Sequence, residues 1–226
     1  MRLCALPAVC ALQCVRTALL RELLEVKEFN IVLAGVGGQG TLLAAEILGT
    51  AAVKEGLNVR VSEIHGMAQR GGAVVSSVRI GESVMAPTIV DGQADVLLGF
   101  EPLETVRNLK YASEKTLVIM SSQRIPPTEL AVKDLKYPSI EEVKQRIHRF
   151  TEKLIIVHAS ELAKVAGSSL VQNSVLVGAL TAVTGFPVKV ENVIDALKQL
   201  VPAKHVETNV KAFQLGYDAV KKEKVG

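Results

Sequence analysis

A short apolar segment, a glycine-rich loop and an apolar helix follow one another near the start of the chain. Residues 29–34 (FNIVLA) have the pattern of a buried strand, and residues 41–55 place apolar side chains on nearly every face of a predicted helix. Residues 35–40 (GVGGQG) lie between them and contain the spacing G-x-G-x-x-G. This order is typical of the first strand, loop and helix of a Rossmann-like α/β fold.

The remainder of the chain continues the alternation of strands and helices. Gly56 is predicted to end the first helix, and Ser139 with Glu142 predicts a capping box at the start of a later one. Further strands are predicted at residues 58–63, 73–80, 95–100, 116–120 and 154–158. Further helices are predicted from residue 102, from 139 to near 150, at 160–166, and as three closing helices within 173–183, 193–201 and 206–220. This alternation predicts a three-layer, mostly parallel sheet with helices on both faces.

Length and composition fit one folded domain. The 226 residues are 49% hydrophobic and 22% charged, which allows a sizeable core and argues against disorder. We expect residues 28–226 to form this domain and residues 1–27 to precede it as an extension. Aromatic residues make up only 4%, and the net charge of +3 is spread along the chain, so nucleic-acid binding is not expected. Membrane insertion is not expected either, because the domain has no apolar run of sufficient length.

All three cysteines lie in the first fourteen residues, as Cys4, Cys10 and Cys14. The rest of the chain therefore has no thiolate to ligate an iron–sulfur cluster, to form a disulfide or to act as a nucleophile. No metal site is predicted in this chain. If the protein takes part in redox chemistry, the metal centre is expected on a partner.

The first glycine loop suits an anionic ligand. Gly35 is expected to permit a tight turn, and Gly37 and Gly38 to let backbone amides approach the ligand. Gly40 is expected to let the helix pack on the strand. Glu63 ends the second predicted strand, where a dinucleotide-binding fold places the acid that binds ribose. The loop alone leaves open a nicotinamide-dependent dehydrogenase and a tight turn that binds nothing.

A second polar loop, IHGMAQRGG at residues 64–72, follows the second predicted strand. His65 places a titratable group on this loop, and Arg70 a fixed cation. For His65, a structural hydrogen bond and a chemical role are both open. Arg70 is expected to bind a carboxylate or to lie in an interface, because the loop is otherwise uncharged. Gly71 and Gly72 are expected to let the next strand start close to a neighbour.

Together the two loops resemble those of a known family. GVGGQG and SEIHGMAQRGG (residues 62–72), separated by one helix and one strand, resemble the gamma-type domain of 2-oxoacid:ferredoxin oxidoreductases. The form S-E-x-H-G-M-x-Q-R-G-G is similar to the indolepyruvate branch in particular. The resemblance covers residues 29–220 and includes a predicted helix that opens near Asn173, in QNSVLVGALTAVTG. Residues 1–27 have no counterpart in it.

The resemblance implies a reaction that is shared between subunits. The complete enzyme decarboxylates a 2-oxoacid, an aryl pyruvate in the indolepyruvate branch, on thiamine diphosphate. Electrons pass through [4Fe–4S] clusters to ferredoxin, and coenzyme A leaves as an acyl-CoA. Thiamine diphosphate, Mg²⁺ and the clusters belong to a large alpha subunit, in the cytoplasm. The small subunit is inactive alone and helps to form the substrate and coenzyme A side of the site.

The resemblance also implies which residues form the site. Those expected to act on the substrate are Glu63, His65, Gln69 and Arg70, with Met67 beside them. Those expected to bind the cofactor are Gly35, Gly37, Gly38, Gln39, Gly40, Gly71, Gly72 and Asn173. Asn173 has an alternative interpretation as the N-cap of a helix that begins at Ser174. Two other functions stay open, a free-standing nicotinamide dehydrogenase and a non-catalytic assembly subunit.

Overall fold

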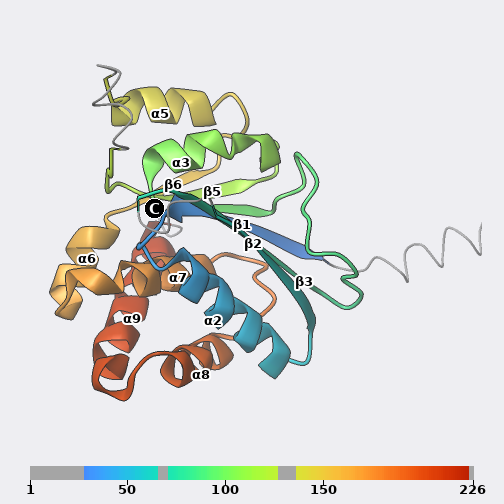
Figure 1. Cartoon of the computed structure of the whole chain (residues 1–226), viewed down its shortest axis with the longest axis vertical. Coiled ribbons are helices and arrows are strands. Elements are labelled where there is room, and N and C mark those ends of the chain that lie inside the picture. Colours follow the sequence, from blue (N-terminus) through green and yellow to red (C-terminus); the bar gives the residue numbers. More distant parts are fainter. Residues whose placement is uncertain (1–27, 66–70, 127–135, 224–226) are drawn as a thin grey trace, which may run out of the picture.

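The structure is a computed structural model that describes residues 28–65, 71–126 and 136–223. It contains a six-stranded sheet with helices on both faces (Figure 1). The strand order is β2-β3-β1-β4-β5-β6. The strands are β1 (Phe29–Val36), β2 (Asn58–His65), β3 (Ala73–Gly81), β4 (Val96–Gly99), β5 (Leu117–Ser121) and β6 (Leu154–Val157). The predicted three-layer α/β fold is confirmed.

Strand β3 runs against all the others. The pairs β1–β4, β4–β5 and β5–β6 are parallel, whereas β3 is antiparallel to both β1 and β2. The sequence analysis did not predict this reversal. Only residues 66–72 connect β2 with β3, and a parallel connection needs about a dozen residues or more. The short connection therefore makes an antiparallel pair, so the ends of β1 and β2 and the start of β3 lie at one edge.

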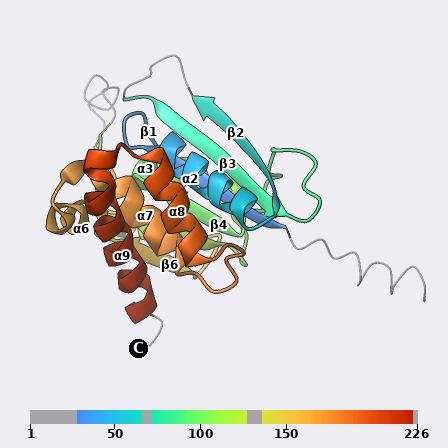
Figure 2. The ribbon, with the colours of Figure 1, turned by 90° about the horizontal axis from the view of Figure 1, so that it is seen from below.

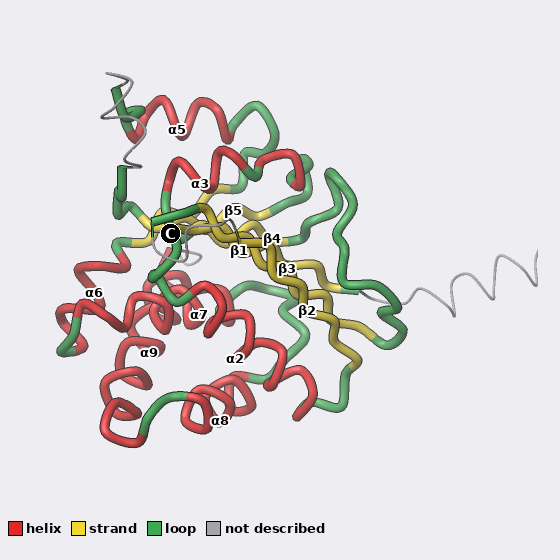
Figure 3. Tube along the Cα trace, viewed as in Figure 1, coloured by secondary structure: helices red, strands yellow, loops and turns green. Residues whose placement is uncertain are grey.

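The two faces of the sheet are covered by different sets of helices (Figure 2; Figure 3). One face carries α2 (Thr41–Lys54), α6 (Ala159–Ala166), α7 (Gln172–Thr181), α8 (Val190–Leu200) and α9 (Val206–Glu223). The other face carries α3 (Pro102–Arg107) and α5 (Ile140–Ile147). Three short 3-10 helices are η1 (Leu109–Tyr111), η2 (Ser169–Val171) and η3 (Ala203–His205). The prediction of helices on both faces is confirmed.

Strand β1 divides the core between these two layers. Ile31 and Leu33 belong to the apolar cluster beneath α2 and α7, whereas Val32 and Ala34 belong to the cluster beneath α3 and α5. All four side chains are at most 1% exposed. A strand buried on both faces reads as a continuous apolar run, which explains the sequence FNIVLA.

Helices α7 and α9 pack with their backbones in close contact. A Cβ atom at Gly178 would overlap with the carbonyl oxygen of Phe213, and one at Gly216 would overlap with the carbonyl oxygen of Val175. Every residue of α7 from Asn173 to Thr181 is buried. A helix that is apolar all round is suited to this interior position, where α7 lies among the other helices of its layer.

The predicted ends of two helices are confirmed. Gly56 follows α2 with φ 84°, a left-handed conformation that glycine adopts without strain. Ser139 and Glu142 form the predicted capping box, with each side chain bound to the other residue's backbone amide. The hydrogen bonds that the Ser139 amide and then the Ser139 hydroxyl donate to the carboxylate lower the pKa of the Glu142 side chain. The helix from residue 102 is shorter than predicted, because Leu109 starts the 3-10 helix η1 instead.

Candidate functional site

The two glycine-rich loops meet through their backbones. The amide of Gly37 donates to the carbonyl oxygen of Gly72 at 2.8 Å, and the amide of Gly71 donates to the carbonyl oxygen of Gly37 at 3.2 Å. These bonds continue the β1–β3 pairing, whose last partners are Val36 and Ala73. The start of β3 thus lies close to a neighbour, the first loop, although a Cβ atom at Gly71 would meet no other atom within 4 Å, so at this position the glycine is required by its positive φ and not by lack of space.

The predicted role of Gly35 in a tight turn is wrong. Gly35 lies within β1, opposite Val74, because the strand continues to Val36. A Cβ atom at this position would lie 2.8 Å from the Cβ atom of Phe100, so the space beside the strand excludes a side chain. The turn is made instead by Gly38, with φ 103°, and Gly40, with φ 78°.

Gly40 and Asn173 hold the start of α2 against α7. A Cβ atom at Gly40 would lie 2.9 Å from Nδ2 of Asn173, so Gly40 permits a close approach to α7. The sequence analysis had predicted a close approach to the strand instead. Asn173 is 5% exposed. It is not an N-cap, because η2 leads directly into α7 and Val171 occupies the N-cap position. The structure therefore brings Asn173 beside the first loop. Its expected role in binding the cofactor stays a prediction.

Gln39 closes the first loop with its side chain. Its Oε1 accepts a hydrogen bond from the amide of Val36 at 2.7 Å, and its Nε2 donates to the carbonyl oxygen of Phe100 at 2.9 Å. Both functional ends of the amide are thus occupied within the protein. Gln39 fixes the shape of the loop and the distance between the ends of β1 and β4.

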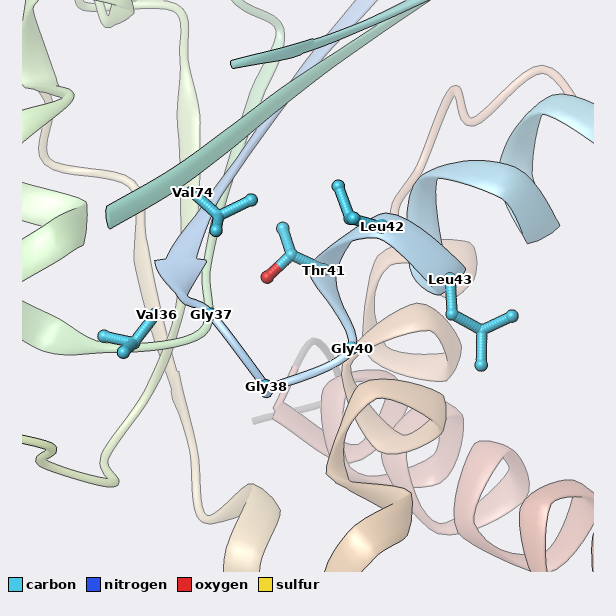
Figure 4. Close-up of a pocket in the computed structure, with 8 residues that line it drawn as sticks. All are labelled: Val36, Gly37, Gly38, Gly40, Thr41, Leu42, Leu43 and Val74. Carbon is cyan, nitrogen blue, oxygen red and sulfur yellow. The ribbon is translucent and has the colours of Figure 1, made fainter. Parts of the chain in front are cut away.

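A cavity of about 480 Å³ lies between the first loop, the start of α2 and β3 (Figure 4). It is lined by Val36, Gly37, Gly38, Gly40, Thr41, Leu42, Leu43 and Val74. The Thr41 hydroxyl is buried and has no hydrogen-bond partner among the described residues. Gly40, the N-cap of α2, has no side-chain cap, and the first helical bond is donated by Ala44. The earlier amides of the helix are therefore available to an anionic group.

A second cavity, of about 350 Å³, lies on the other side of the same loop. It is lined by Val36, Gly37, Gly38, Gln39, Gly71, Phe100, Gln123, Ile125, Ser169, Leu170, Gln172 and Leu176. The side-chain oxygen of Gln123 is buried, and no described residue donates a hydrogen bond to it. A ligand with an N–H or O–H group would supply the missing donor. The sequence analysis missed both Thr41 and Gln123, because their unpaired atoms are visible only in the folded chain.

The second loop is described only in part. The sequence analysis predicted that His65 lies in this loop. Strand β2 instead continues through Ile64 to His65, which lies opposite Val74 of β3. Met67, Gln69 and Arg70 lie outside the described residues. Gly71 has φ 78° and lines the second cavity.

Glu63 lies far from the first loop. It is exposed and pairs with Ser76 of β3, and β3 separates β2 from β1. Two strand spacings amount to roughly 10 Å. In a dinucleotide-binding fold, the strand that carries the ribose-binding acid lies next to β1. The expected placement of Glu63 is therefore wrong, and the dehydrogenase alternative loses its main support.

In the part of the chain that the structure describes, no group of three or more His, Cys, Asp or Glu side chains is arranged to hold a metal ion. None of the described helices has the length and the apolar character that crossing a membrane requires.

Residues 30–219 match the model of the pyruvate ferredoxin/flavodoxin oxidoreductase family. The chain belongs to this family. It is 45% identical over 197 residues to the indolepyruvate oxidoreductase subunit IorB of Pyrococcus horikoshii, covering 87% of this chain and 98% of that one. The predicted resemblance to the indolepyruvate branch is thereby confirmed.

Solved structures agree with the fold. The keto/oxoacid ferredoxin oxidoreductase gamma subunit of Geobacter sulfurreducens superimposes with a TM-score of 0.62 at 26% identity, over 85% of this chain and 98% of that one. The 2-oxoglutarate:ferredoxin oxidoreductase of Magnetococcus marinus gives a TM-score of 0.67 at 19% identity, over 88% of this chain but only 32% of that one. In that longer protein, the same fold forms about a third of one chain.

A buried carboxylate near the site was not anticipated. Glu101 is 0% exposed and forms no ion pair with any described residue. Its Oε2 accepts from the amide of Glu104 at 2.9 Å, and its Oε1 accepts from the amide of Ile125 at 3.2 Å and from the hydroxyl of Tyr137. Burial, and then the hydrogen bond to Glu101, raise the pKa of the Tyr137 phenol, which stays a donor.

Glu101 thereby positions the wall of the second cavity. Ile125 lines this cavity, and Phe100, the neighbour of Glu101, is bound to Gln39 of the first loop. The sequence signal was an acidic residue directly before Pro102, since proline favours the first position of a helix. The three donors to the carboxylate come from separate segments, which the sequence alone does not bring together.

Proposed function

We propose that this chain is the small subunit of a 2-oxoacid:ferredoxin oxidoreductase that acts on aryl pyruvates such as indolepyruvate. The complete enzyme converts the 2-oxoacid and coenzyme A to an acyl-CoA and CO₂ and reduces ferredoxin. The observation that carries the proposal is the full-length similarity to the subunit IorB, which includes both loops. The relatives are subunits of oxidoreductases that act on 2-oxoacids.

The proposed division of labour follows from the composition of the chain. Residues 15–226 contain no cysteine, so thiolate-bound [4Fe–4S] clusters are assigned to a large alpha subunit, together with thiamine diphosphate and Mg²⁺. Beside the second cavity, Leu170 is 87% exposed, and beside the first, Leu42 is 40% exposed. Exposed apolar side chains next to a site are suited to an interface with this larger subunit. Residues 28–226 are proposed to act as one domain in this cytoplasmic complex.

The role proposed for this chain is to bind and position coenzyme A and to exclude water. The free amides at the start of α2 suit an anionic group of coenzyme A. The unpaired oxygen of Gln123 suits an amide N–H of the pantetheine part of coenzyme A. His65, Gln69 and Arg70 are proposed to contact the substrate or the large subunit. The chain positions the reactants and supplies no nucleophile.

The test begins with a tagged version of the chain, purified from its native cells under anaerobic conditions. The eluate is assayed for coenzyme A-dependent viologen reduction with indolepyruvate, pyruvate and 2-oxoglutarate. We expect a large, cluster-containing subunit to co-purify and indolepyruvate to be the preferred substrate. A lone chain without activity, or tight binding of NAD by that chain, would instead support the dehydrogenase alternative.

A pair of variants tests whether the second loop takes part in turnover. We expect Arg70→Ala to lower kcat/KM about tenfold or more, because a charge-assisted contact is lost. Arg60→Ala is the matched control, since Arg60 is exposed on β2 and its guanidinium binds only the carbonyl oxygen of Val59 among the described residues. Normal turnover by an assembled Arg70→Ala enzyme would refute a functional role for Arg70. Loss of assembly alone would support the non-catalytic alternative.

A further inference from the structure

A third cavity lies apart from the glycine loops, where β5 and β6 end. Its volume is about 440 Å³, and it is lined by Ser122, Arg124, Ile140, Lys144, Ile156 and His158. Four of these six side chains are polar, and none of them belongs to the two loops. Ligands of α/β sheets of this kind bind outside the carboxyl ends of the parallel strands. The position and the lining both indicate a binding site.

The segment that follows β5 separates this cavity from the cavity beside the first loop. Gln123 and Ile125 line the loop cavity, whereas Ser122 and Arg124 line the third cavity. Alternate residues of an extended segment point to opposite sides, which accounts for the division. The two cavities are therefore neighbours with different linings, and the third is the more cationic.

Ser122 and His158 form a fixed polar pair within this lining. The Ser122 hydroxyl lies 3.0 Å from Nδ1 of His158, and the Ser122 amide donates to the carbonyl oxygen of Val157 at 3.0 Å. His158 is the N-cap residue of α6, and its side chain makes no capping bond. Its Nε2 atom therefore remains available, since no hydrogen bond to Nε2 is formed by the described residues.

The cations of the cavity are only partly compensated. The Arg124 guanidinium lies 5.8 Å from the centre of the Tyr137 ring, and it forms no ion pair or hydrogen bond with the rest of the described chain. Lys144 is 2.9 Å from a carboxylate oxygen of Glu141, whose side chain is 67% exposed. The neighbouring carboxylate of Glu142 is bound to Ser139 in the capping box. One guanidinium thus stays without an anionic partner.

From this arrangement we infer that the third cavity binds a phosphoryl group. A guanidinium offers two parallel N–H groups that match two phosphoryl oxygens. The Ser122–His158 pair supplies one further donor, because the hydrogen bond within the pair uses either the hydroxyl proton of Ser122 or the Nδ1 proton of His158. Lys144 adds a cation that now binds only one exposed carboxylate. The phosphoryl group is supplied either by a free phosphate or diphosphate or by coenzyme A. The second source rests on the proposed function, whereas the binding site itself does not.

Calorimetric titration of the full chain, in its purified assembly, with pyrophosphate tests the site directly. We expect saturable binding that Arg124→Gln weakens about tenfold and Ser122→Ala weakens about threefold. Arg149→Gln is the matched control: Arg149 is also exposed and carries the same charge but does not line the cavity. It should change the affinity by less than about twofold, since a distant surface charge is screened by salt. Circular dichroism melts verify that each variant is folded.

Repeating the titration with coenzyme A and with dephospho-coenzyme A distinguishes the sources. If Arg124→Gln weakens the binding of coenzyme A but not that of dephospho-coenzyme A, the cavity binds the 3′-phosphate of coenzyme A. If the substitution weakens the binding of pyrophosphate alone, the cavity binds a free phosphate or diphosphate. The inference is overturned if pyrophosphate does not bind saturably, or if Arg124→Gln and Lys144→Gln both leave its affinity unchanged. An inactive enzyme would disprove the proposed function but leave the pyrophosphate result readable.

Discussion

The hydrogen bonds of a few single side chains determine the shape of the candidate site. Gln39 uses both ends of its amide to join β1 and β4, and Glu101 accepts hydrogen bonds from three segments of the chain. The family resemblance implied that Gln39 belongs to the first loop and binds the cofactor, but it did not predict these internal hydrogen bonds. The loop needs these internal bonds because its glycines, Gly38 and Gly40, have no side chains to fix their conformation.

Replacing Glu101 should be strongly destabilising. In Glu101→Ala, one buried donor and two half-buried donors lose their acceptor, and each unsatisfied group costs roughly 1 kcal/mol. We expect the free energy of unfolding in urea to fall by about 3 kcal/mol. Tyr137→Phe removes only one of the three donors, together with the hydroxyl that accepts from the amide of Leu103 at 3.2 Å, and should cost about 1 to 2 kcal/mol. Equal losses in the two variants would contradict the role assigned to the carboxylate.

At the level of elements, close helix packing depends on residues that a periodicity analysis does not reveal. The apolar spacing predicted α7 and α9 correctly as helices, yet it gave no sign that Gly178 and Gly216 let their backbones touch. The antiparallel direction of β3 was missed for a similar reason. Strand patterns show which residues are buried, but the direction of a strand depends on the length of its connection.

The α7–α9 contact predicts a large effect of one methyl group. Gly178→Ala would place its Cβ atom against the backbone of Phe213, which cannot rotate away. We expect a loss of about 3 kcal/mol or more in the free energy of unfolding. Gly49→Ala is the control: Gly49 is also within a helix, but its Cβ atom would meet only the side chain of Val61, at 3.3 Å. That variant should stay within about 1 kcal/mol of the wild type.

The contact between α2 and α8 predicts how stability depends on pH. Glu55 accepts hydrogen bonds from the amide of Lys189 and from Nδ2 of Asn192, and it forms an ion pair with Lys189. These contacts, the amide of Lys189 first, lower the pKa of Glu55 below its ordinary value of 4.5. The folded state thus favours the carboxylate, so its contribution is complete above pH 4.5 and is lost as the pH falls through the lowered value.

Urea unfolding between pH 3 and pH 6 measures this contribution. Glu55→Gln should be less stable than the wild type at pH 6, and the difference should shrink as the pH falls towards 3. Glu46→Gln serves as the control, because Glu46 is exposed on α2 and has no hydrogen-bond partner among the described residues. The free energy of unfolding of Glu46→Gln should depend on pH in the same way as that of the wild type. A constant difference between Glu55→Gln and wild type would show that charge is not the cause.

For the whole molecule, the domain boundary proposed from the sequence can be tested by truncation. The family match begins at residue 30, and among the described residues the first buried member of the apolar clusters is Ile31, with Phe29 packed against one of them. We expect both the full chain and a chain that begins at Glu28 to unfold in a single cooperative transition and to assemble with the same large subunit. Thermal unfolding and co-purification measure the two outcomes. Loss of either would place residues 1–27 inside the functional unit.

The backbone pairing of the two loops restricts how their lengths can vary. Gly37 and Gly72 extend the β1–β3 ladder, so the first loop is joined at one end to α2 and at the other to a fixed register. A strand that shifts by one residue turns every side chain to the opposite face of the sheet. The insertion of one residue between Val36 and Gly37, or the deletion of either one, would therefore break the pairing with Gly72 or shift β1 against β3, and it would not change the loop alone. Surface loops usually tolerate such changes in length. The lengths of these two loops are instead limited by the register of the sheet to which their backbones are hydrogen-bonded.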